Sequence, residues 1–379
     1  MESKHPKSNT FGILFMILLL GIAFFNFFHK DVVFSKEENR NLTLKPVMNQ
    51  SDLLSGDYQK KYENNRNDQF IGRAKGVSIK NRLEHKLGNN KIDDVYIANN
   101  NLLMQSFTTP SSAFIKEKAD ALLTFKQKYP TIPFSMILSP NKISIYEDQL
   151  PSNAPKSNQP KIMEEFQNQI KDSVSCLDVY ATLNPHKKET IFYKGDHHLT
   201  TLGAKYVFED YMAMKQIPLK DITYEKHISN ADFVGSLSNK IGFHQIKDQV
   251  ELYLPVNDPT QVVVNYVGEQ SKKPTFYDAS KQFSSSAYDV FLSGNHPYIK
   301  IATTSLENRR LLILKDSFAN CMIPFLAPYY NEINVIDPRY YYGDLDALMV
   351  DEAINEVLII GNANTFFADS SLQELLMGE

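Results

Sequence analysis

The sequence contains no tryptophan, only two cysteines and only 15 glycines among its 379 residues. Cys176 and Cys321 allow at most one disulfide, and two cysteines cannot form a zinc knuckle or an iron–sulfur site by themselves. Neither sign of charge predominates: the chain has 40 Lys and Arg residues and 44 Asp and Glu residues, which gives a net charge of −4. This balance excludes a nucleic-acid-binding footprint, while 42% hydrophobic side chains exclude disorder as the dominant state.

One long apolar run, residues 11–28, interrupts the sequence near its N-terminus and holds no charge and a single amide, Asn26. A helix of this length measures roughly 27 Å, close to the thickness of a bilayer's hydrocarbon core. Lys4 and Lys7 precede it, which favours a cytoplasmic N-terminus. We therefore expect a cytoplasmic tail at 1–10 and a single-pass signal anchor at the cell membrane, with the C-terminal domain extracytoplasmic.

A cleaved signal peptide is the alternative interpretation of the same run. However, the run is longer than a typical signal-peptide core, and Phe27, Phe28, His29 and Lys30 stand where a cleavage site needs small residues. The residues therefore favour a retained anchor.

The chain after the anchor falls into a polar segment and a region of alternating helix and strand patterns. Residues 29–90 have helical spacings without a deep apolar face, which is typical of a polar stalk or helical lead-in. Beyond residue 90, apolar runs bounded by turn residues predict buried strands between amphipathic helices. Strands are expected at 95–97, 132–138, 311–314, 333–336 and 357–360, and helices at 111–130, 161–174 and 318–326. This alternation predicts an α/β domain with a parallel sheet over residues 91–379.

The stretch from about 215 to 305 has a different pattern. Strand-like segments at 261–266, 275–277 and 288–292 are separated by Gly, Pro, Asn and Ser. We interpret this stretch as a β-rich insertion into the α/β domain.

The first candidate for chemistry is Asp196-His197-His198, which directly precedes a helix that starts near Leu202. A carboxylate that holds the Nδ1 proton of a histidine leaves Nε2 free to act as a base. Two other roles compete, because these residues can also be exposed caps or an incomplete metal site. The tripeptide alone leaves all three open.

The second candidate is Ser317, which follows a buried strand and precedes a helix in LLILKDSFAN. Ligands bind at the carboxyl ends of strands in open α/β sheets, and a helix N-terminus supplies N–H groups to an oxyanion. Taken alone, Ser317 is more simply the N-cap of that helix. Together with Asp196 and His198, it completes a nucleophile, a base and an orienting acid.

The blocks YKGDHHLTTLGA and LLILKDSFANCMIPFLAPYYNEINVIDPRYY resemble those of the bacterial DHHW proteins, which are related to SGNH-hydrolase-like alginate O-acetyltransferases. The resemblance extends to ENR after the anchor, NDQFIGR near residue 70, DFVGS at 232–236 and VFLSGNHP at 290–297. It therefore covers most of the chain beyond residue 35.

This resemblance implies an SGNH-like parallel sheet flanked by helices, in which the Asp/His pair precedes the Ser, a permuted order relative to simple GDSL hydrolases. It assigns Ser317 as the nucleophile, His198 as the base and Asp196 as its orienter, with His197 as the alternative base. Leu199 departs from the motif, which has Trp there, and removes a ring that could stack on a sugar.

Three further residues are weaker candidates. Gly294 and Asn295 can donate a backbone N–H and a side-chain amide to an oxyanion, although such a pair is more often an ordinary turn. Arg339 can bind an anionic group, or pair on the surface with Asp337 or Asp344.

The resemblance implies an extracytoplasmic O-acyltransferase that transfers acetyl to a cell-surface polysaccharide through an acyl-serine. Its expected partner is a multi-pass membrane acyltransferase that delivers acyl groups; no cofactor or metal is required and no nucleic acid is bound. A carbohydrate esterase with the same three residues, and a non-catalytic polysaccharide-binding or assembly protein, are the alternatives.

Overall fold

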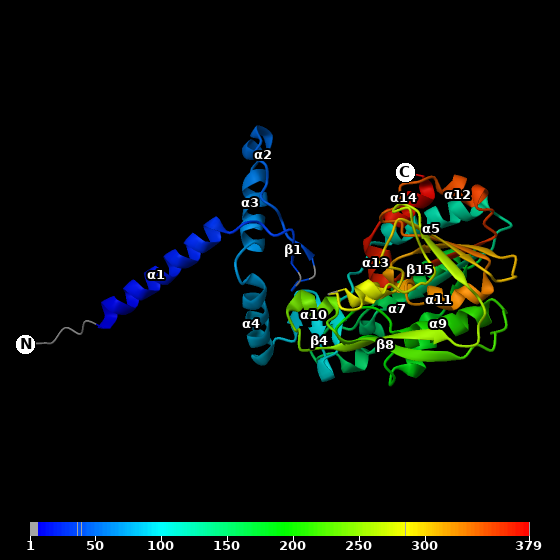
Figure 1. The fold of residues 1–379 in the computed structure, drawn as a ribbon, viewed down its shortest axis with the longest axis horizontal. Coiled ribbons are helices and arrows are strands. Elements are labelled where there is room, and N and C mark those ends of the chain that lie inside the picture. The colour runs from blue at the N-terminus through cyan, green and yellow to red at the C-terminus, as the bar shows by residue number, and fades with distance from the viewer. Residues whose placement is uncertain (1–6, 36, 39, 285, 379) are drawn as a thin grey trace, which may run out of the picture. The chain divides into compact units, whose positions relative to one another are not determined.

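The computed structural model describes residues 7–35, 37–38, 40–284 and 286–378. It divides into two compact units (Figure 1). The first comprises Met1–Asn89 with Asn239–Phe243, and the second comprises Asn90–Ser238 with His244–Glu379.

The first unit begins with helix α1 (Lys7–Phe28). Its segment Thr10–Phe28 is long and apolar enough to cross a membrane, and it is almost entirely exposed, so it is consistent with a single-pass anchor. The charged stretch that follows forms a two-stranded ribbon and three helices. These are β1 (Phe34–Ser35), β2 (Arg40–Asn41), α2 (Gln50–Ser55), α3 (Asp57–Asp68) and α4 (Arg73–Lys86).

The second unit is built on an eight-stranded sheet with the order β11-β10-β12-β14-β13-β15-β6-β7. Five neighbouring strands are parallel: β14 (Glu332–Ile336), β13 (Arg310–Lys315), β15 (Glu356–Asn362), β6 (Phe134–Ser139) and β7 (Ser175–Leu177). The other three, β12 (Tyr298–Thr303), β10 (Val262–Tyr266) and β11 (Ser271–Lys273), are antiparallel. The expected α/β class with a mostly parallel sheet is therefore confirmed.

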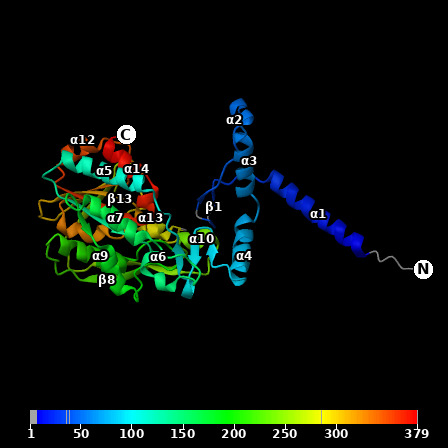
Figure 2. The same ribbon diagram turned by 180° about the vertical axis from the view of Figure 1, so that it is seen from behind.

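Helices cover both faces of this sheet, which is why its inner strands are continuous apolar runs. Alternate residues of β13 face opposite sides: Leu311 and Ile313 belong to one core, and Leu312 and Leu314 to the other. The first core is closed by α8 (Val179–Leu183), α9 (Thr201–Met214) and α11 (Ile323–Leu326). The second is closed by α5 (Ser112–Lys128), α7 (Gln159–Ile170), α12 (Leu345–Asp351), α13 (Ala363–Ala368) and α14 (Ser371–Met377). Figure 2 shows α5, α12 and α14 on the side of the strands opposite α9.

Short segments complete the second unit. A three-stranded ribbon contains β3 (Lys91–Ile92), β4 (Val95–Ile97) and β5 (Leu103–Gln105), and α6 (Lys142–Ile145) follows β6. Short 3-10 turns are η1 (Asn99–Asn101), η2 (Glu147–Gln149), η3 (Asn184–His186), η4 (Ala279–Lys281), η5 (Ala287–Val290), η6 (Ser317–Ala319) and η7 (Ala327–Tyr329).

The expected β-rich stretch divides into two parts. A hairpin of β8 (Tyr224–Phe233) and β9 (Asp248–Pro255), with α10 (Ser236–Ile241) between them, lies outside the main sheet, whereas β10 to β12 extend that sheet. The strands predicted at 275–277 and 288–292 were wrong. Tyr277 and Phe291 form only an isolated bridge, and 287–290 is the 3-10 turn η5. Their apolar side chains pack into the core from irregular backbone, which imitates a strand pattern.

The helix predicted at 318–326 is broken into η6 and α11, and η7 follows it. Pro324 stands in the first turn of α11, where its missing N–H costs nothing, but it prevents one continuous helix from running through this segment. The nucleophile candidate is therefore followed by a single 3-10 turn rather than by a long helix.

Candidate active site

Ser317 lies directly beyond the carboxyl end of β13, at the start of the 3-10 turn η6. Asp316 is the residue that caps this turn, because its Oδ1 accepts the N–H of Phe318 at 2.9 Å. Its Oδ2 accepts the N–H of Asn362 at 2.8 Å, and burial raises the pKa of Asp316. The capping role that competed for Ser317 thus belongs to its neighbour, and the Ser317 hydroxyl is left for another partner.

That partner is His198, whose Nε2 lies 2.7 Å from Ser317 Oγ although the two residues are 119 positions apart in the chain. The other ring nitrogen, Nδ1, lies 2.6 Å from Asp196 Oδ1. A carboxylate can only accept here, so Nδ1 carries the proton and Nε2 accepts from the serine hydroxyl. The fold therefore joins Asp196, His198 and Ser317 in a single hydrogen-bonded chain.

Asp196 is buried and fully engaged. Its Oδ1 accepts the backbone N–H of His198 at 2.9 Å, and its Oδ2 accepts the backbone N–H of Ser236 at 2.7 Å. Burial alone raises the pKa of this carboxyl, but the His198 and His197 rings and these N–H groups together hold the pKa of Asp196 well below its ordinary value. Asp196 is therefore an ionised acceptor at neutral pH.

The loop that carries Asp196 is held by two buried charged side chains that the sequence patterns did not single out. The Asp248 carboxylate accepts the backbone N–H groups of Lys194 and Gly195 at 2.7 and 2.8 Å. Lys142 donates from Nζ to the carbonyls of Tyr193 and Lys194 at 2.9 and 3.0 Å, and burial lowers its pKa to about 8. The turn before the helix α9 is thus fixed from both sides.

Gly235 passes so close to this loop that it has no room for a side chain. A Cβ at this position would lie 2.4 Å from Asp196 Cβ and 2.5 Å from the Gly195 carbonyl oxygen. We expect Gly235→Ala to displace the Asp196 loop and to lower the free energy of unfolding by about 1–3 kcal/mol. Thermal unfolding measures the change in stability, and the rate of acetyl transfer reports the displacement of the Asp196 loop. Gly268→Ala, where a Cβ meets nothing within 4 Å, is the matched control, and equal behaviour of the two variants would contradict the prediction.

Tyr288, in the turn η5, was missed by the sequence analysis. Its ring stacks on the His198 ring, with centroids 3.8 Å apart and planes at 8°, and its hydroxyl donates to the Ser317 carbonyl at 3.0 Å. Tyr288 is buried, and burial raises its pKa well above the ordinary value, so it remains a neutral donor. This one side chain therefore contacts both members of the Ser–His pair.

We expect Tyr288→Phe and Tyr288→Leu to separate these two contacts. The phenylalanine keeps the stack and loses one hydrogen bond worth about 1 kcal/mol, a loss of about fivefold in kcat/KM. The leucine loses the stack as well, so the imidazole is less well held and the loss is larger. Esterase assays of both folded variants measure these losses. Equal activity of the leucine and phenylalanine variants would contradict the prediction.

His197, the alternative base, places its Nδ1 2.7 Å from Ser236 Oγ, whereas the ring nitrogen that contacts Ser317 Oγ is Nε2 of His198. Burial and the neighbouring His198 lower the pKa of His197 to about 3. We therefore expect its imidazole to stay neutral between about pH 5 and 8, where an ordinary histidine titrates. NMR of ring nitrogens, with His197→Gln for assignment, measures this, and a His197 midpoint within that range would contradict it.

Asp196, His197 and His198 also offer one candidate metal-ligand atom each, all within 4.8 Å of one another. Their hydrogen bonds occupy most of these atoms, since Asp196 Oδ1 accepts from His198 and His197 Nδ1 lies against Ser236. The donor set therefore fits the proton-relay role better than a metal site.

Gly294 and Asn295, the candidates for oxyanion donors, both make hydrogen bonds within the protein. The N–H of Gly294 donates to the Phe291 carbonyl at 3.0 Å and is not free for an oxyanion. The Asn295 Oδ1 accepts from Lys315 Nζ at 2.8 Å, so any donation from this side chain to an oxyanion must come from its NH₂ group. Within the described part of the chain, the backbone N–H of Ser317 has no hydrogen-bond partner. This N–H, rather than that of Gly294, is the better-placed backbone donor.

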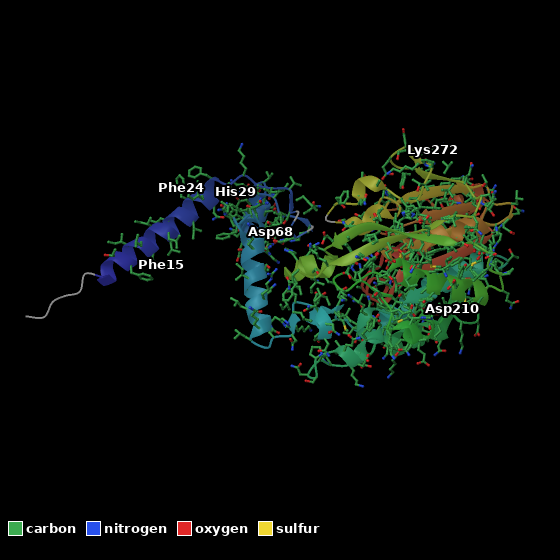
Figure 3. The ribbon with its side chains drawn as sticks, turned by 60° about the horizontal axis from the view of Figure 1, so that its bottom comes forward. Phe15, Phe24, His29, Asp68, Asp210 and Lys272 are labelled. Atoms are coloured by element: carbon green, nitrogen blue, oxygen red, sulfur yellow. The ribbon has the colours of Figure 1, made fainter. Side chains whose placement is uncertain are left out.

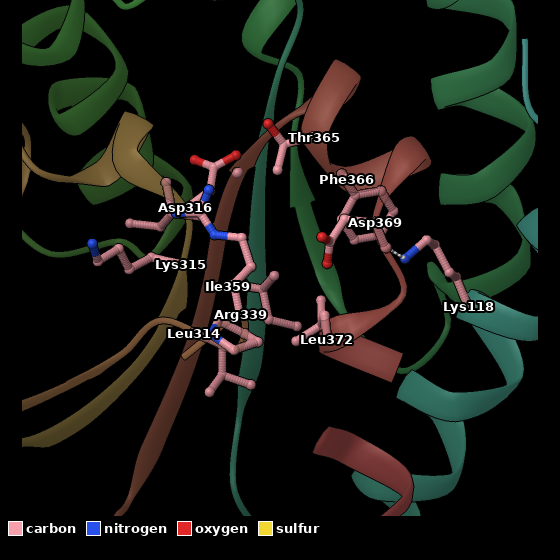
Figure 4. Close-up of a pocket in the computed structure, with 13 residues that line it drawn as sticks. Lys118, Leu314, Lys315, Asp316, Arg339, Ile359, Thr365, Phe366, Asp369 and Leu372 are labelled. Carbon is pink, nitrogen blue, oxygen red and sulfur yellow. Dashed lines mark hydrogen bonds between the residues drawn. The ribbon is translucent and has the colours of Figure 1, made fainter. Parts of the chain in front are cut away.

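Arg339 makes a two-pronged ion pair with Asp337, with Nε–Oδ1 and Nη2–Oδ2 distances of 2.8 and 2.6 Å. Asp337, one of the two partners raised for Arg339, is thus paired with it, but the Asp337 carboxylate is fully buried, so this is not a surface pair. Arg339 also lines a narrow, mainly apolar pocket at the carboxyl ends of β13 and β15 (Figure 4). Asp316 and Thr365 border the same pocket.

Leu199 is 4% exposed and packs in the core beneath the site, with its backbone bridged to Phe192. An apolar side chain packed beside the turn therefore occupies the position where the motif has Trp. The rings of Tyr288, His197 and Phe318 lie beside the His198 ring, with centroids 3.8, 3.9 and 5.2 Å away.

Comparison with known proteins gives a family and a fold. The family model described as DHHW protein matches residues 89–336. A DHHW family protein from Eubacterium siraeum has a TM-score of 0.66 and 23% identity, over 76% of this chain and 96% of that one. PatB1 of Bacillus cereus has a TM-score of 0.63 and 20% identity, over 73% and 98% of the two chains. A second PatB1 structure, described as carrying a sulfonyl adduct, has a TM-score of 0.62 at 20% identity, over 74% and 99%. Among curated proteins, no match was found.

Proposed function

The chain belongs to the DHHW protein family, and from this premise we propose that it is an extracytoplasmic O-acyltransferase with Ser317 as its nucleophile. The observation that carries the proposal is the hydrogen-bonded chain from Asp196 through His198 to Ser317. A serine hydroxyl is a weak nucleophile at neutral pH and needs an adjacent base, which in turn needs an orienting group. All three parts are present.

The proposed reaction has two steps. In the first, Ser317 Oγ attacks the acyl carbonyl while its proton passes to His198 Nε2, and His198 returns that proton to the departing group of the donor. In the second, a sugar hydroxyl loses its proton to His198 and attacks the acyl-serine, and Ser317 recovers its proton as it leaves. Asp196 stabilises the imidazolium formed in both steps, and the N–H of Ser317 is the proposed donor to the developing oxyanion.

The family's relation to alginate O-acetyltransferases supports acetyl as the group and a cell-surface polysaccharide as the acceptor. The helix α1 supports a protein held at the membrane with its second unit outside the cytoplasm. A multi-pass membrane acyltransferase is the proposed partner, because acetyl groups made in the cytoplasm must cross the bilayer before Ser317 can receive them.

The test uses the full chain in detergent, an activated acetyl ester as donor and candidate glycans as acceptors. We expect acetyl to appear on the sugar in proportion to glycan concentration. Release of acetate alone, at a rate that no glycan changes, would assign an esterase with the same three residues. Failure of both reactions in a folded protein would favour a non-catalytic polysaccharide-binding or assembly protein.

A sulfonyl fluoride is a suitable first probe, because it modifies activated hydroxyls and because a PatB1 structure is described with a sulfonyl adduct. We expect labelling of Ser317 and loss of acetyl transfer in the same proportion.

A further inference from the structure

Two short sequence segments in the first unit, ENR and NDQFIGR, play no part in the chemistry above but contact each other. Arg40 binds Asp68 through both guanidinium Nη atoms, at 2.7 and 3.0 Å, and its Nε contacts Glu38 at 2.7 Å. Arg73 completes the set by an ion pair with Glu38. These four side chains, which we call the polar clamp, tie the ribbon β1–β2 to the corner between α3 and α4.

The same corner, residues 69–72, is attached to the end of α1. The Asn26 side chain accepts the N–H of Ile71 at 2.8 Å, and Arg66 donates to the Asn26 carbonyl at 2.7 Å. Gln69 is buried and bonds both the N–H and the carbonyl of Val32, at 2.9 and 3.0 Å. Figure 3 labels His29 and Asp68 close together at this point. The last turn of the apolar helix is therefore fixed against the corner.

The corner presents apolar side chains to solvent beside that helix end. Phe70 and Ile71 are 48% and 45% exposed, and Phe27 and Phe28 of α1 are 70% and 66% exposed. The segment Thr10–Phe28 has 19 residues, so a span of about 28 Å places Phe27 and Phe28 at the edge of the hydrocarbon layer. Phenylalanine and other apolar side chains on an exposed apolar face insert at the headgroup–acyl boundary, and a cation such as Arg66 is attracted to anionic headgroups there.

We propose that the α3–α4 corner docks on the lipid bilayer, with Phe70 and Ile71 at headgroup depth beside Phe27 and Phe28. The polar clamp holds the corner in this position, so that the lead-in helices leave the membrane in one fixed direction. This proposal rests on the membrane-anchoring part of the proposed function and is independent of Ser317.

The natural absence of tryptophan makes the test direct, because each introduced tryptophan is the only one in the chain. Phe70→Trp reports on the corner, Phe15→Trp on the span, and Leu87→Trp, at an 88% exposed position after α4, on solvent. Each full-length variant is reconstituted in phosphatidylcholine–phosphatidylglycerol vesicles whose lipids carry bromine either near the headgroup or deep in the acyl chains.

We expect the variant Phe70→Trp to lose most of its emission to shallow bromines and less to deep ones, Phe15→Trp to show the reverse order, and Leu87→Trp to be unaffected. Adding Asp68→Asn to Phe70→Trp opens the clamp and reduces the quenching, whereas adding it to Phe15→Trp changes nothing. The proposal is overturned if Phe70→Trp behaves like Leu87→Trp in vesicles where Phe15→Trp is quenched. Lack of quenching in Phe15→Trp would overturn it by removing the anchor, without bearing on acyl transfer by Ser317.

Discussion

Replacement of Ser317 by alanine is expected to lower the rate of acetyl transfer at least about 10³-fold, equivalent to about 4 kcal/mol of transition-state stabilisation. Without Ser317 Oγ no acyl-serine can form. His198 and the backbone N–H groups of the site remain, and they give only residual activity. The change removes one partly exposed hydroxyl, so the fold is expected to persist. Initial rates with an activated acetyl ester measure the effect, and unfolding by heat checks the fold.

Ser236→Ala is the matched control for this variant. Ser236 is a second serine beside a histidine, but its hydroxyl contacts His197, and it supports Asp196 through the backbone N–H that alanine retains. We expect the rate of acetyl transfer by this variant to fall less than about tenfold, which corresponds to the loss of one hydrogen bond. A larger loss in Ser236→Ala than in Ser317→Ala would transfer the nucleophile role to Ser236.

Asp196→Asn is expected to lower kcat about 10⁴-fold. An amide in place of the carboxylate no longer fixes the Nδ1 proton of His198, so Nε2 is no longer set as an acceptor for the Ser317 hydroxyl, and the imidazolium is less stabilised. Steady-state kinetics at saturating donor measure the change. Asp232→Asn, an exposed carboxylate in the neighbouring strand, should be nearly silent.

The double variant Asp196→Asn with Ser317→Ala sharpens this prediction. If Asp196 acts only through His198 on Ser317, the change Asp196→Asn should not lower the rate of acetyl transfer any further once Ser317 is alanine. The double variant should then have the same rate as Ser317→Ala. Additive losses would mean that Asp196 acts by another route, such as holding the loop through Ser236.

Much of the fold was predictable because the buried strands are short, continuous apolar runs and the helices carry local signals. Ser111 and Thr200 cap α5 and α9 through their side chains, and Pro130 follows α5. These features depend on neighbours in sequence. The segment around Tyr288 was wrongly predicted as a strand, because its apolar side chains are buried by tertiary contacts rather than by a sheet.

The residue types of the site could be predicted, but not their supports. Asp196, His198 and Ser317 stand in two recognisable blocks, so their proximity was expected. Tyr288 and Asp248 reach the site from distant segments, and no local pattern in the sequence marks a ring stacked on an imidazole or a carboxylate bound to two backbone N–H groups. Such contacts arise only when the sheet and the β8–β9 hairpin are assembled.

The central claim is that Ser317, activated by His198, carries the acyl group. Its most direct test is peptide mapping by mass spectrometry of the full-length protein, quenched in acid shortly after mixing with an activated acetyl ester. The account predicts one acetyl group, on Ser317, that disappears when a suitable glycan is added and never forms in His198→Ala. Acetyl on another side chain such as Ser236, formed equally fast when Ser317 is alanine, would contradict it.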